Sequence, residues 1–170
     1  MEACALISRA IEVAAHFHAR QADRNGAPYI LHPLRVMNAV RTAGFGEDFQ
    51  IIGVLHDVLE DTQAQLQDFV WLGKRLTTSL VAITRDFEKN PEGLVFNEFG
   101  AIIPGPAKET HAEYFERCVK NSITRVVKYY DTLDNMDPRR FTEGVPVGRY
   151  AKVLTWYKKN GIEAPPINPF

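Results

Sequence analysis

Hydrophobic residues recur at intervals of three and four along most of this chain, which is the spacing that places them on one face of an α-helix. Near the N-terminus the pattern predicts an amphipathic helix over about residues 3–21. The same pattern predicts a second helix from near Pro33 to Gly44. Further helices are predicted over residues 47–60, 66–72, 76–84, 110–120, 122–136 and 147–160. We therefore predict an all-α fold.

One segment, residues 86–110, lacks this periodicity. It contains residues that favour turns and interrupt helices, namely Asn90-Pro91, Gly93, Gly100 and Pro104-Gly105-Pro106. We expect one long irregular loop here, with a short hairpin across Leu94–Ile103. Long loops in compact domains are often functional, and a functional loop and a neutral insertion both stay open. The proline-rich tail, Ala164–Phe170, is expected to lie extended.

Composition narrows the class of protein. The 170 residues suffice for one domain with a sizeable core, and a hydrophobic content of 45% is typical of a globular chain. We therefore take residues 1–170 as a single domain. The net charge of −1 provides no field that would attract nucleic acid or a membrane surface. The chain also lacks a basic stripe with interleaved aromatic residues, so a nucleic-acid partner is not expected.

The cysteines and the N-terminus bear on location. Cys4 and Cys118 are far apart and match no metal-ligand spacing. The N-terminus has no basic segment followed by an uninterrupted apolar run, and no apolar stretch is long enough to span a bilayer. These features predict a reduced, cytoplasmic protein, and they leave the oligomeric state open.

The chemically informative stretch is Leu55–Thr62, with the sequence LHDVLEDT. It overlaps the apolar run Ile51–Leu59, which is typical of a buried helix. Burial of an imidazole and three carboxylates is costly unless a metal ion or a strong partner compensates them. The stretch therefore predicts a metal site with catalytic carboxylates attached.

Two histidines and two aspartates are the candidate metal ligands: His32, His56, Asp57 and Asp131. Neighbours on one helix point about 100° apart, yet the His-Asp pair can still reach one ion in a groove beside the helix. Two imidazoles with two carboxylates suit a borderline divalent ion such as Mn, Fe, Co or Zn. Each residue also has a structural alternative, since His32 can cap a helix and Asp131 can pair with Lys128. Only the full set, together with the nearby acids, favours a metal.

Four ordered blocks resemble the HD-domain phosphohydrolases, above all the hydrolase domain of RelA/SpoT-type proteins and their small stand-alone relatives. The first comprises Ala15-His16, Gln21 and Gly26–Val36 (GAPYILHPLRV). The others are Leu55–Thr62, Ile83-Thr84-Arg85 and Val127–Asn135 (VKYYDTLDN). Together the blocks extend over about residues 6–160.

This resemblance implies an all-α HD-domain helical bundle that binds a divalent metal, usually manganese, through the four candidate ligands. It also implies that Glu60 and Asp61 assist catalysis and that Asn135 contacts substrate. The implied reaction removes pyrophosphate from the 3′ position of the alarmones ppGpp and pppGpp, the nucleotides of the stringent response. The small-molecule partner would therefore be a nucleotide.

Residues around this core suggest how catalysis and substrate binding would work. Glu60 and Asp61 lie one helical turn past the His-Asp pair, so a carboxylate there can exchange a proton with water or with the leaving oxygen. The alternative is that Asp61 merely ends the helix. Arg24, in the loop before His32, and Lys128 are candidate phosphate ligands. Tyr150 is expected to close the pocket, or else to pack in the core.

Several nearby residues receive weaker interpretations. Arg35 is a third phosphate candidate, whereas Asp134 and the pair Arg139-Arg140 are expected to be solvated surface charges. His16 matches the family block and is expected to pack or to support the ligands.

Two departures from the family pattern keep other substrates open. Ala22-Asp23-Arg24 stands where the family often has a basic run, and Lys128-Tyr129-Tyr130 replaces smaller residues. A hydrolase of another nucleotide phosphate, such as a 5′-nucleotide or an NADPH-like dinucleotide, therefore remains an alternative. A module that binds a nucleotide without cleaving it is a third.

Overall fold

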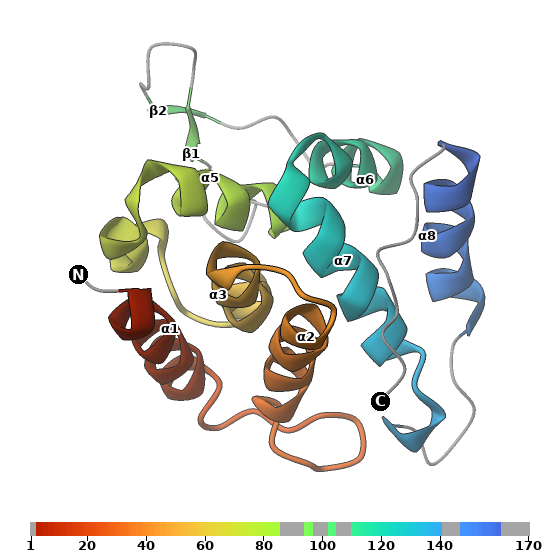
Figure 1. Ribbon diagram of the computed structural model, residues 1–170, viewed down its shortest axis with the longest axis horizontal. Coiled ribbons are helices and arrows are strands. Elements are labelled where there is room, and N and C mark those ends of the chain that lie inside the picture. The colour runs from red at the N-terminus through yellow and green to blue at the C-terminus, as the bar shows by residue number, and fades with distance from the viewer. Residues whose placement is uncertain (1–2, 86–93, 97–101, 105–109, 141–146, 161–170) are drawn as a thin grey trace.

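The computed structural model describes residues 3–85, 94–96, 102–104, 110–140 and 147–160. Its α-helices are α1 (Ala3–Phe17), α2 (Leu31–Thr42), α3 (Glu47–Leu55), α4 (Val58–Asp61), α5 (Gly73–Ile83), α6 (His111–Lys120), α7 (Ser122–Asn135) and α8 (Val147–Lys159). Two 3₁₀ segments, η1 (Leu66–Leu72) and η3 (Pro138–Arg140), accompany them. The predicted all-helical framework is confirmed (Figure 1).

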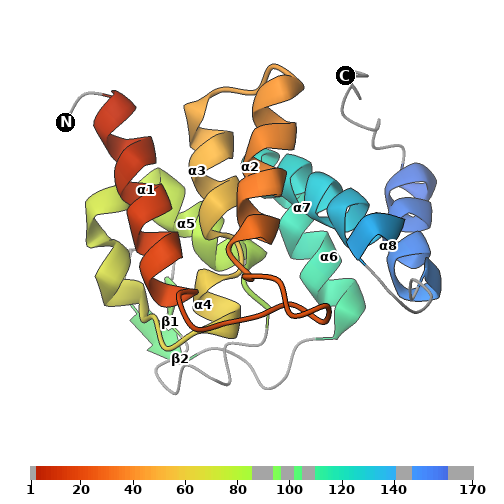
Figure 2. The same cartoon turned by 90° about the horizontal axis from the view of Figure 1, so that it is seen from below.

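Helix α3 lies at the centre of the bundle and packs against α1, α2, α5 and α7. Figure 2 shows α1, α3 and α2 side by side, with α4 below them. A helix surrounded in this way has to be apolar on all sides, and residues 51–55 of α3 are all buried. The site described below lies where α3 ends, so two of its residues directly follow a fully buried segment.

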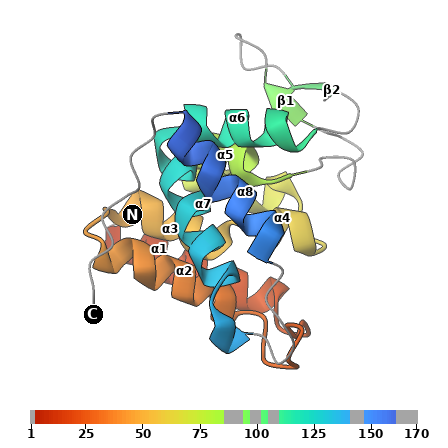
Figure 3. The same cartoon turned by 90° about the vertical axis from the view of Figure 1, so that its right-hand side faces the viewer.

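Helix α7 forms the other wall of the site. It packs against α2 and α3 on one side and against α5, α6 and α8 on others, and Figure 3 shows α8 in front of α7. Val126 and Val127 point into the core as expected. The chain enters α7 through Asn121, whose side chain accepts hydrogen bonds from the backbone N–H groups of Ile123 and Thr124 and so caps the helix.

Gly53 allows α3 to approach α2 closely. A Cβ atom at this position would lie 3.2 Å from the Cα of Met37, which is tighter than an ordinary contact. The absence of a side chain therefore sets the separation of the two helices that carry His32 and His56.

The predicted hairpin in the irregular segment is confirmed. Strands β1 (Leu94–Phe96) and β2 (Ile102–Pro104) pair antiparallel, with Val95 opposite Ile103. The rest of residues 86–109 and the predicted extended tail after residue 160 lie outside the described residues. Within the described part of the chain, no helix has the length and apolar character needed to cross a membrane.

The predicted helix over residues 47–60 is wrong in one respect, because it is interrupted at His56 and Asp57. The His56 ring bonds the carbonyl oxygen of Gly53, which the Asp57 N–H would use in a continuous helix. Side-chain bonds of this kind compete with helical ones. The first helix also ends at Phe17 rather than near residue 21, and the 3₁₀ turn η3 was not predicted.

Candidate metal centre and active site

Three segments that are distant in sequence bring the four predicted metal ligands together. His32 lies in the first turn of α2, His56 and Asp57 form the turn between α3 and α4, and Asp131 lies in α7. Nε2 of His32 is 3.1 Å from Oδ1 of Asp131 and 3.4 Å from Oδ2 of Asp57. Nε2 of His56 is 3.0 Å from Oδ2 of Asp57 and 3.5 Å from Oδ1 of Asp131. Each of the four side chains therefore directs one atom toward a common centre.

The ring of His56 is oriented so that one nitrogen remains for a metal ion. Its Nδ1 lies 2.9 Å from the carbonyl oxygen of Gly53, and a carbonyl can only accept, so Nδ1 carries the proton. The buried Nε2 has no hydrogen-bonding partner among the described residues, although it faces the oxygens of Asp57 and Asp131. A lone pair that faces carboxylate oxygens in a buried site requires a cation or a proton between them.

The charge state of the cluster leads to the same conclusion. Burial lowers the pKa of His56, but the charges of Asp57 and Asp131 outweigh burial and raise that pKa to about 9. Burial likewise opposes charging of His32, yet hydrogen bonds to Asp131, Asp134 and Asp57 raise its pKa well above the ordinary value. In the metal-free protein both imidazoles therefore hold protons. Nitrogen and oxygen donors of this kind fit a divalent ion, which would displace those protons.

Two predicted substrate ligands, Lys128 and Asn135, both contact Asp131, one of the predicted metal ligands. Nζ of Lys128 lies 2.7 Å from Oδ2 of Asp131, and Nδ2 of Asn135 donates to Oδ1 at 2.5 Å. Burial raises the pKa of Asp131, but the Lys128 charge and both imidazoles outweigh it and hold that pKa well below its usual range. Asp131 is therefore kept ionised and oriented from both sides.

Glu60 lies in α4, one turn beyond the His-Asp pair. Its side chain accepts a hydrogen bond from the backbone N–H of Arg85 at 3.0 Å. Burial, reinforced by the charge of Asp57, raises the pKa of Glu60. A carboxyl group whose pKa is raised is better suited to exchange protons near neutral pH.

Glu60 also faces a cavity of about 300 Å³ between α6, α7 and α8. The cavity wall carries cationic and aromatic side chains, and it includes the predicted ligands Lys128 and Tyr150. The other lining residues are Arg85, His111, Tyr114, Phe115, Thr132, Lys152 and Val153. Cationic side chains beside a buried carboxyl group can bind an anionic substrate.

Asp61 and Tyr29 occupy the opposite side of the cluster. The Tyr29 hydroxyl lies 2.7 Å from Oδ2 of Asp57 and 3.1 Å from Oδ2 of Asp61. Burial and the two carboxylate charges raise the pKa of Tyr29 far above its ordinary value, so it remains a donor. Asp61 also receives a hydrogen bond from Gln21 at its backbone oxygen, so it is anchored to the segment after α1. Tyr29 was missed, although it lies within the family block Gly26–Val36.

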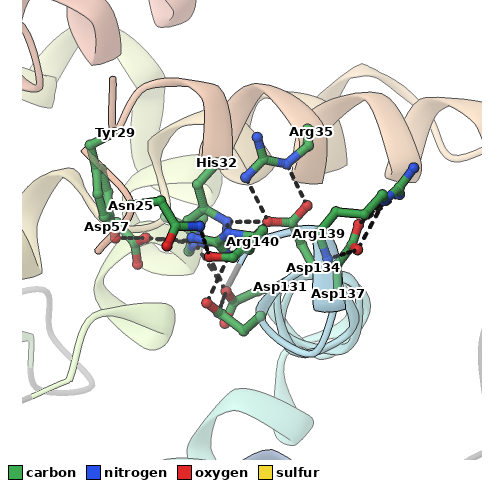
Figure 4. Close-up of polar contacts among 12 residues, drawn as sticks. Asn25, Tyr29, His32, Arg35, Asp57, Asp131, Asp134, Asp137, Arg139 and Arg140 are labelled. Atoms are coloured by element: carbon green, nitrogen blue, oxygen red, sulfur yellow. Dashed lines mark hydrogen bonds and ion pairs between the residues drawn. The ribbon is translucent and has the colours of Figure 1, made fainter. Parts of the chain in front are cut away.

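The structure corrects the interpretation of three charged residues. Asp134 was expected to be a surface acid, but its side chain is 11% exposed and lies 2.7 Å from Nδ1 of His32. Arg35 was a phosphate candidate, but it forms two hydrogen bonds with Asp134. Arg140 was expected to be solvated, but it is 12% exposed and also binds Asp134. Figure 4 shows these side chains gathered beside His32.

Other predictions have mixed outcomes. His16 is exposed, and the buried histidine of this region is His18, whose Nδ1 lies 2.5 Å from Oε1 of Gln21. Arg139 is exposed, as expected, and pairs with Asp137. Arg24 is exposed in the turn between α1 and α2, and its role as a substrate ligand stays a prediction.

Comparisons with known proteins extend these observations. No family model matches the chain. A probable guanosine-3′,5′-bis(diphosphate) 3′-pyrophosphohydrolase of Synechocystis sp. is 35% identical over 131 residues, which cover 77% of this chain and 16% of that protein. A protein of the same description from Mycoplasma pneumoniae is 34% identical over 152 residues, covering 82% and 19% respectively. The chain therefore spans less than a fifth of the length of these relatives.

A solved structure is also similar. It is described as a metazoan ortholog of SpoT that hydrolyzes ppGpp. The superposition covers 96% of this chain and 89% of the chain in that structure, with a TM-score of 0.67. At 22% identity this likeness shows the fold. The motifs, the helical architecture and the curated relatives agree, and we conclude that the chain is homologous to the hydrolase domains of the RelA/SpoT family and has their all-helical HD-domain fold.

Proposed function

We propose that this chain is a metal-dependent hydrolase that removes pyrophosphate from the 3′ position of ppGpp or pppGpp. The products would be pyrophosphate with GDP or GTP. We further propose that residues 1–170 act as one HD domain, that the metal is manganese and that the enzyme works in the cytoplasm. The resemblance to RelA/SpoT-type domains supports the choice of substrate and metal.

The main support for metal-dependent hydrolysis is that His32, His56, Asp57 and Asp131 are oriented toward one centre. The unpartnered Nε2 of His56 indicates that this centre suits a cation. A divalent ion held by these residues would supply an activated water and would offset charge on the phosphoryl oxygens. The protein's contribution is to hold the four donors rigidly in a buried site.

Glu60 is the residue best placed to move a proton. Its carboxyl group lies one turn from the His-Asp pair and faces the cavity, and its raised pKa favours exchange near neutrality. We propose that it accepts the proton of the attacking water or returns one to the leaving 3′ oxygen. Asp61, tied to Tyr29, would orient the same water.

The substrate side of the site is proposed to be the cavity beside Glu60. Lys128 and Tyr150 line it together with Arg85 and Lys152. A nucleotide with two diphosphate groups carries several negative charges, so cationic walls beside the reacting centre suit it. Asn135 and Arg24 would contact the ribose or a phosphate from the other side.

A second candidate is hydrolysis of a different nucleotide phosphate, such as a 5′-nucleotide or an NADPH-like dinucleotide. The sequence Ala22-Asp23-Arg24 favours it, since only Arg24 supplies a cation where the family often has several. The two candidates share the metal centre and differ only in the substrate that is cleaved.

Turnover of ppGpp by the purified protein with added Mn²⁺ tests the proposal. Wild type should release pyrophosphate and GDP, and Asp57→Ala should not. If wild type binds Mn²⁺ but releases no pyrophosphate, ppGpp is not the substrate, and 5′-nucleotides and NADPH become the next substrates to assay. If no nucleotide is cleaved while ppGpp still binds, the chain is a binding module.

A further inference from the structure

We propose that Asp134 is a positioning residue, held in place by Arg35 and Arg140, that orients His32 for metal binding. The inference rests on the metal site in the proposed function. It assigns a role to three charges outside the four ligands, and Figure 4 shows how they connect α2, α7 and η3.

The contacts around Asp134 saturate its carboxylate. Oδ1 accepts from Nε of Arg35 at 2.7 Å. Oδ2 accepts from the second nitrogen of the same fork at 3.2 Å and from Nη1 of Arg140 at 2.8 Å. The fourth contact, 2.7 Å long, joins Oδ2 to Nδ1 of His32. A carboxylate held by two guanidinium groups stays ionised and cannot rotate freely.

The available hydrogen atoms show which group donates in the hydrogen bond between His32 and Asp134. Nη1 of Arg140 carries two hydrogens, and two acceptors are at hand, Oδ2 of Asp134 and Oδ1 of Asn135 at 2.9 Å. Nη1 also lies 3.1 Å from Nδ1 of His32, but no hydrogen remains for that contact. Nδ1 therefore donates to Asp134. The other ring nitrogen, Nε2, is thereby left as the metal-binding atom that faces Asp57 and Asp131.

This arrangement matters because, in the part of the chain that the structure describes, Nδ1 of His32 has no backbone partner comparable to the Gly53 carbonyl that orients His56. A histidine that donates its second ring nitrogen to a carboxylate has its tautomer fixed and its metal-binding nitrogen made more basic. The two arginines place the carboxylate, and Arg140 also binds Asn135, which contacts Asp131. One side-chain network thus supports ligands on both α2 and α7.

Burial distinguishes this network from ordinary surface ion pairs. The side chains of His32, Asp134 and Arg140 are 2%, 11% and 12% exposed. Exposed pairs contribute little because water screens them. The nearby pair of Asp137 and Arg139 has an arginine that is 87% exposed, and it supplies a matched comparison three residues along the same segment.

The test compares Mn²⁺ affinity, measured by competition with a chelator, and the absorption spectrum of bound Co²⁺ in several variants. Asp134→Asn keeps the size of the side chain and removes its charge. We expect it to weaken Mn²⁺ binding by about 10- to 100-fold and to change the Co²⁺ spectrum. Arg140→Ala should weaken binding less, and Arg140→Lys should recover part of the loss. The control Asp137→Asn, which can still accept from the Arg139 N–H, should match wild type.

An Asp134→Asn protein whose Mn²⁺ affinity and Co²⁺ spectrum equal those of wild type overturns the proposal. Cooperative unfolding of metal-free Asp134→Asn establishes that this variant is folded. If it is not folded, Arg140→Ala and Arg140→Lys decide instead. Equal Mn²⁺ affinity in Arg140→Ala, Arg140→Lys and wild type then overturns the proposal. Activity is measured separately. Wild type that binds Mn²⁺ without cleaving ppGpp refutes the proposed function alone, whereas wild type that binds no divalent ion refutes both.

Discussion

The stability of the metal-free protein should fall as the pH rises from neutral toward 9. The reason is His56, which is buried against Asp57 and Asp131 and has a pKa of about 9 instead of the ordinary 6.5. Between these two values the folded protein holds a proton that the unfolded chain releases. The resulting stabilisation is fully present below pH 6.5 and is lost as the pH rises through about 9.

The expected size of the effect follows from the shift. Each tenfold difference in proton affinity corresponds to about 1.4 kcal/mol, so the rise from 6.5 to about 9 contributes on the order of 3 kcal/mol. His32 shifts in the same direction and adds to it. Burial lowers the pKa of His18 below its ordinary value of 6.5. Protonation of His18 therefore changes the stability of the fold only at pH values below about 6.5. A loss of this size is measurable against a total of about 5–15 kcal/mol.

Urea unfolding of EDTA-treated protein across this pH range measures the effect. His16→Gln is the control, because His16 is exposed on α1 and should leave the profile unchanged. Added Mn²⁺ should reverse the trend, since the ion competes with the imidazole protons and binds more tightly as they leave. The free energy of unfolding should then rise with pH.

A flat or rising stability profile for the metal-free protein would refute this reasoning. It would mean that the imidazoles do not hold protons between the carboxylates, and therefore that the four side chains do not converge as described. A falling profile that persists unchanged in saturating Mn²⁺ would instead show that no ion replaces the protons.

Five substitutions extend these tests. His56→Ala should abolish Mn²⁺ binding, measured by metal content after gel filtration, and turnover with it. Glu60→Gln should retain the metal but lower kcat by about 10²–10⁴-fold, so an unchanged kcat would exclude Glu60 from proton transfer. Tyr29→Phe removes the hydroxyl shared by two carboxylates and should lower kcat with little change in the urea midpoint. Gly53→Ala should destabilise the fold by about 1–3 kcal/mol, because its Cβ would meet the α2 backbone at 3.2 Å. In the same urea assay Gly46→Ala should cost less, about 0.5–1 kcal/mol, because the space around it is open and only the N-cap of α3 is weakened.

Much of the helical framework was predictable from apolar spacing. The limits of α6, α7 and α8 agree with the pattern to within about one residue, because each helix has one apolar face on the core. The break at His56 was not predictable in this way, since residues 51–55 are apolar on every side and give no sign of where the helix ends. That break depends on a bond between the His56 ring and the backbone carbonyl of Gly53, which hydrophobic spacing does not predict.

The convergence of the four candidate metal ligands was predictable, because their chemistry is costly to bury. An imidazole and several carboxylates within an apolar run require compensation, and the family blocks supplied the two remaining ligands. Lys128 and Asn135 were identified as site residues, but they contact Asp131 directly, and sequence could not assign those contacts. Whether they also touch substrate stays a prediction.

The contact between Asp134 and His32 shows why contacts between side chains on different helices cannot be predicted from sequence alone. Asp134 on α7 and Arg35 on α2 are charged, and charged side chains are mostly found at the surface. Their contact depends on the packing of α2 against α7, which brings together residues 99 positions apart and leaves the side chain of Asp134 11% exposed and that of Arg35 39% exposed. A polar side chain on a helix is solvated unless another helix covers it, and only the tertiary structure supplies that covering helix. Charges near a predicted metal ligand should therefore be assigned to substrate only after charges on the facing helix have been considered. For this reason we propose that Arg35, a candidate phosphate ligand, and Arg140, an expected surface charge, both support the metal site.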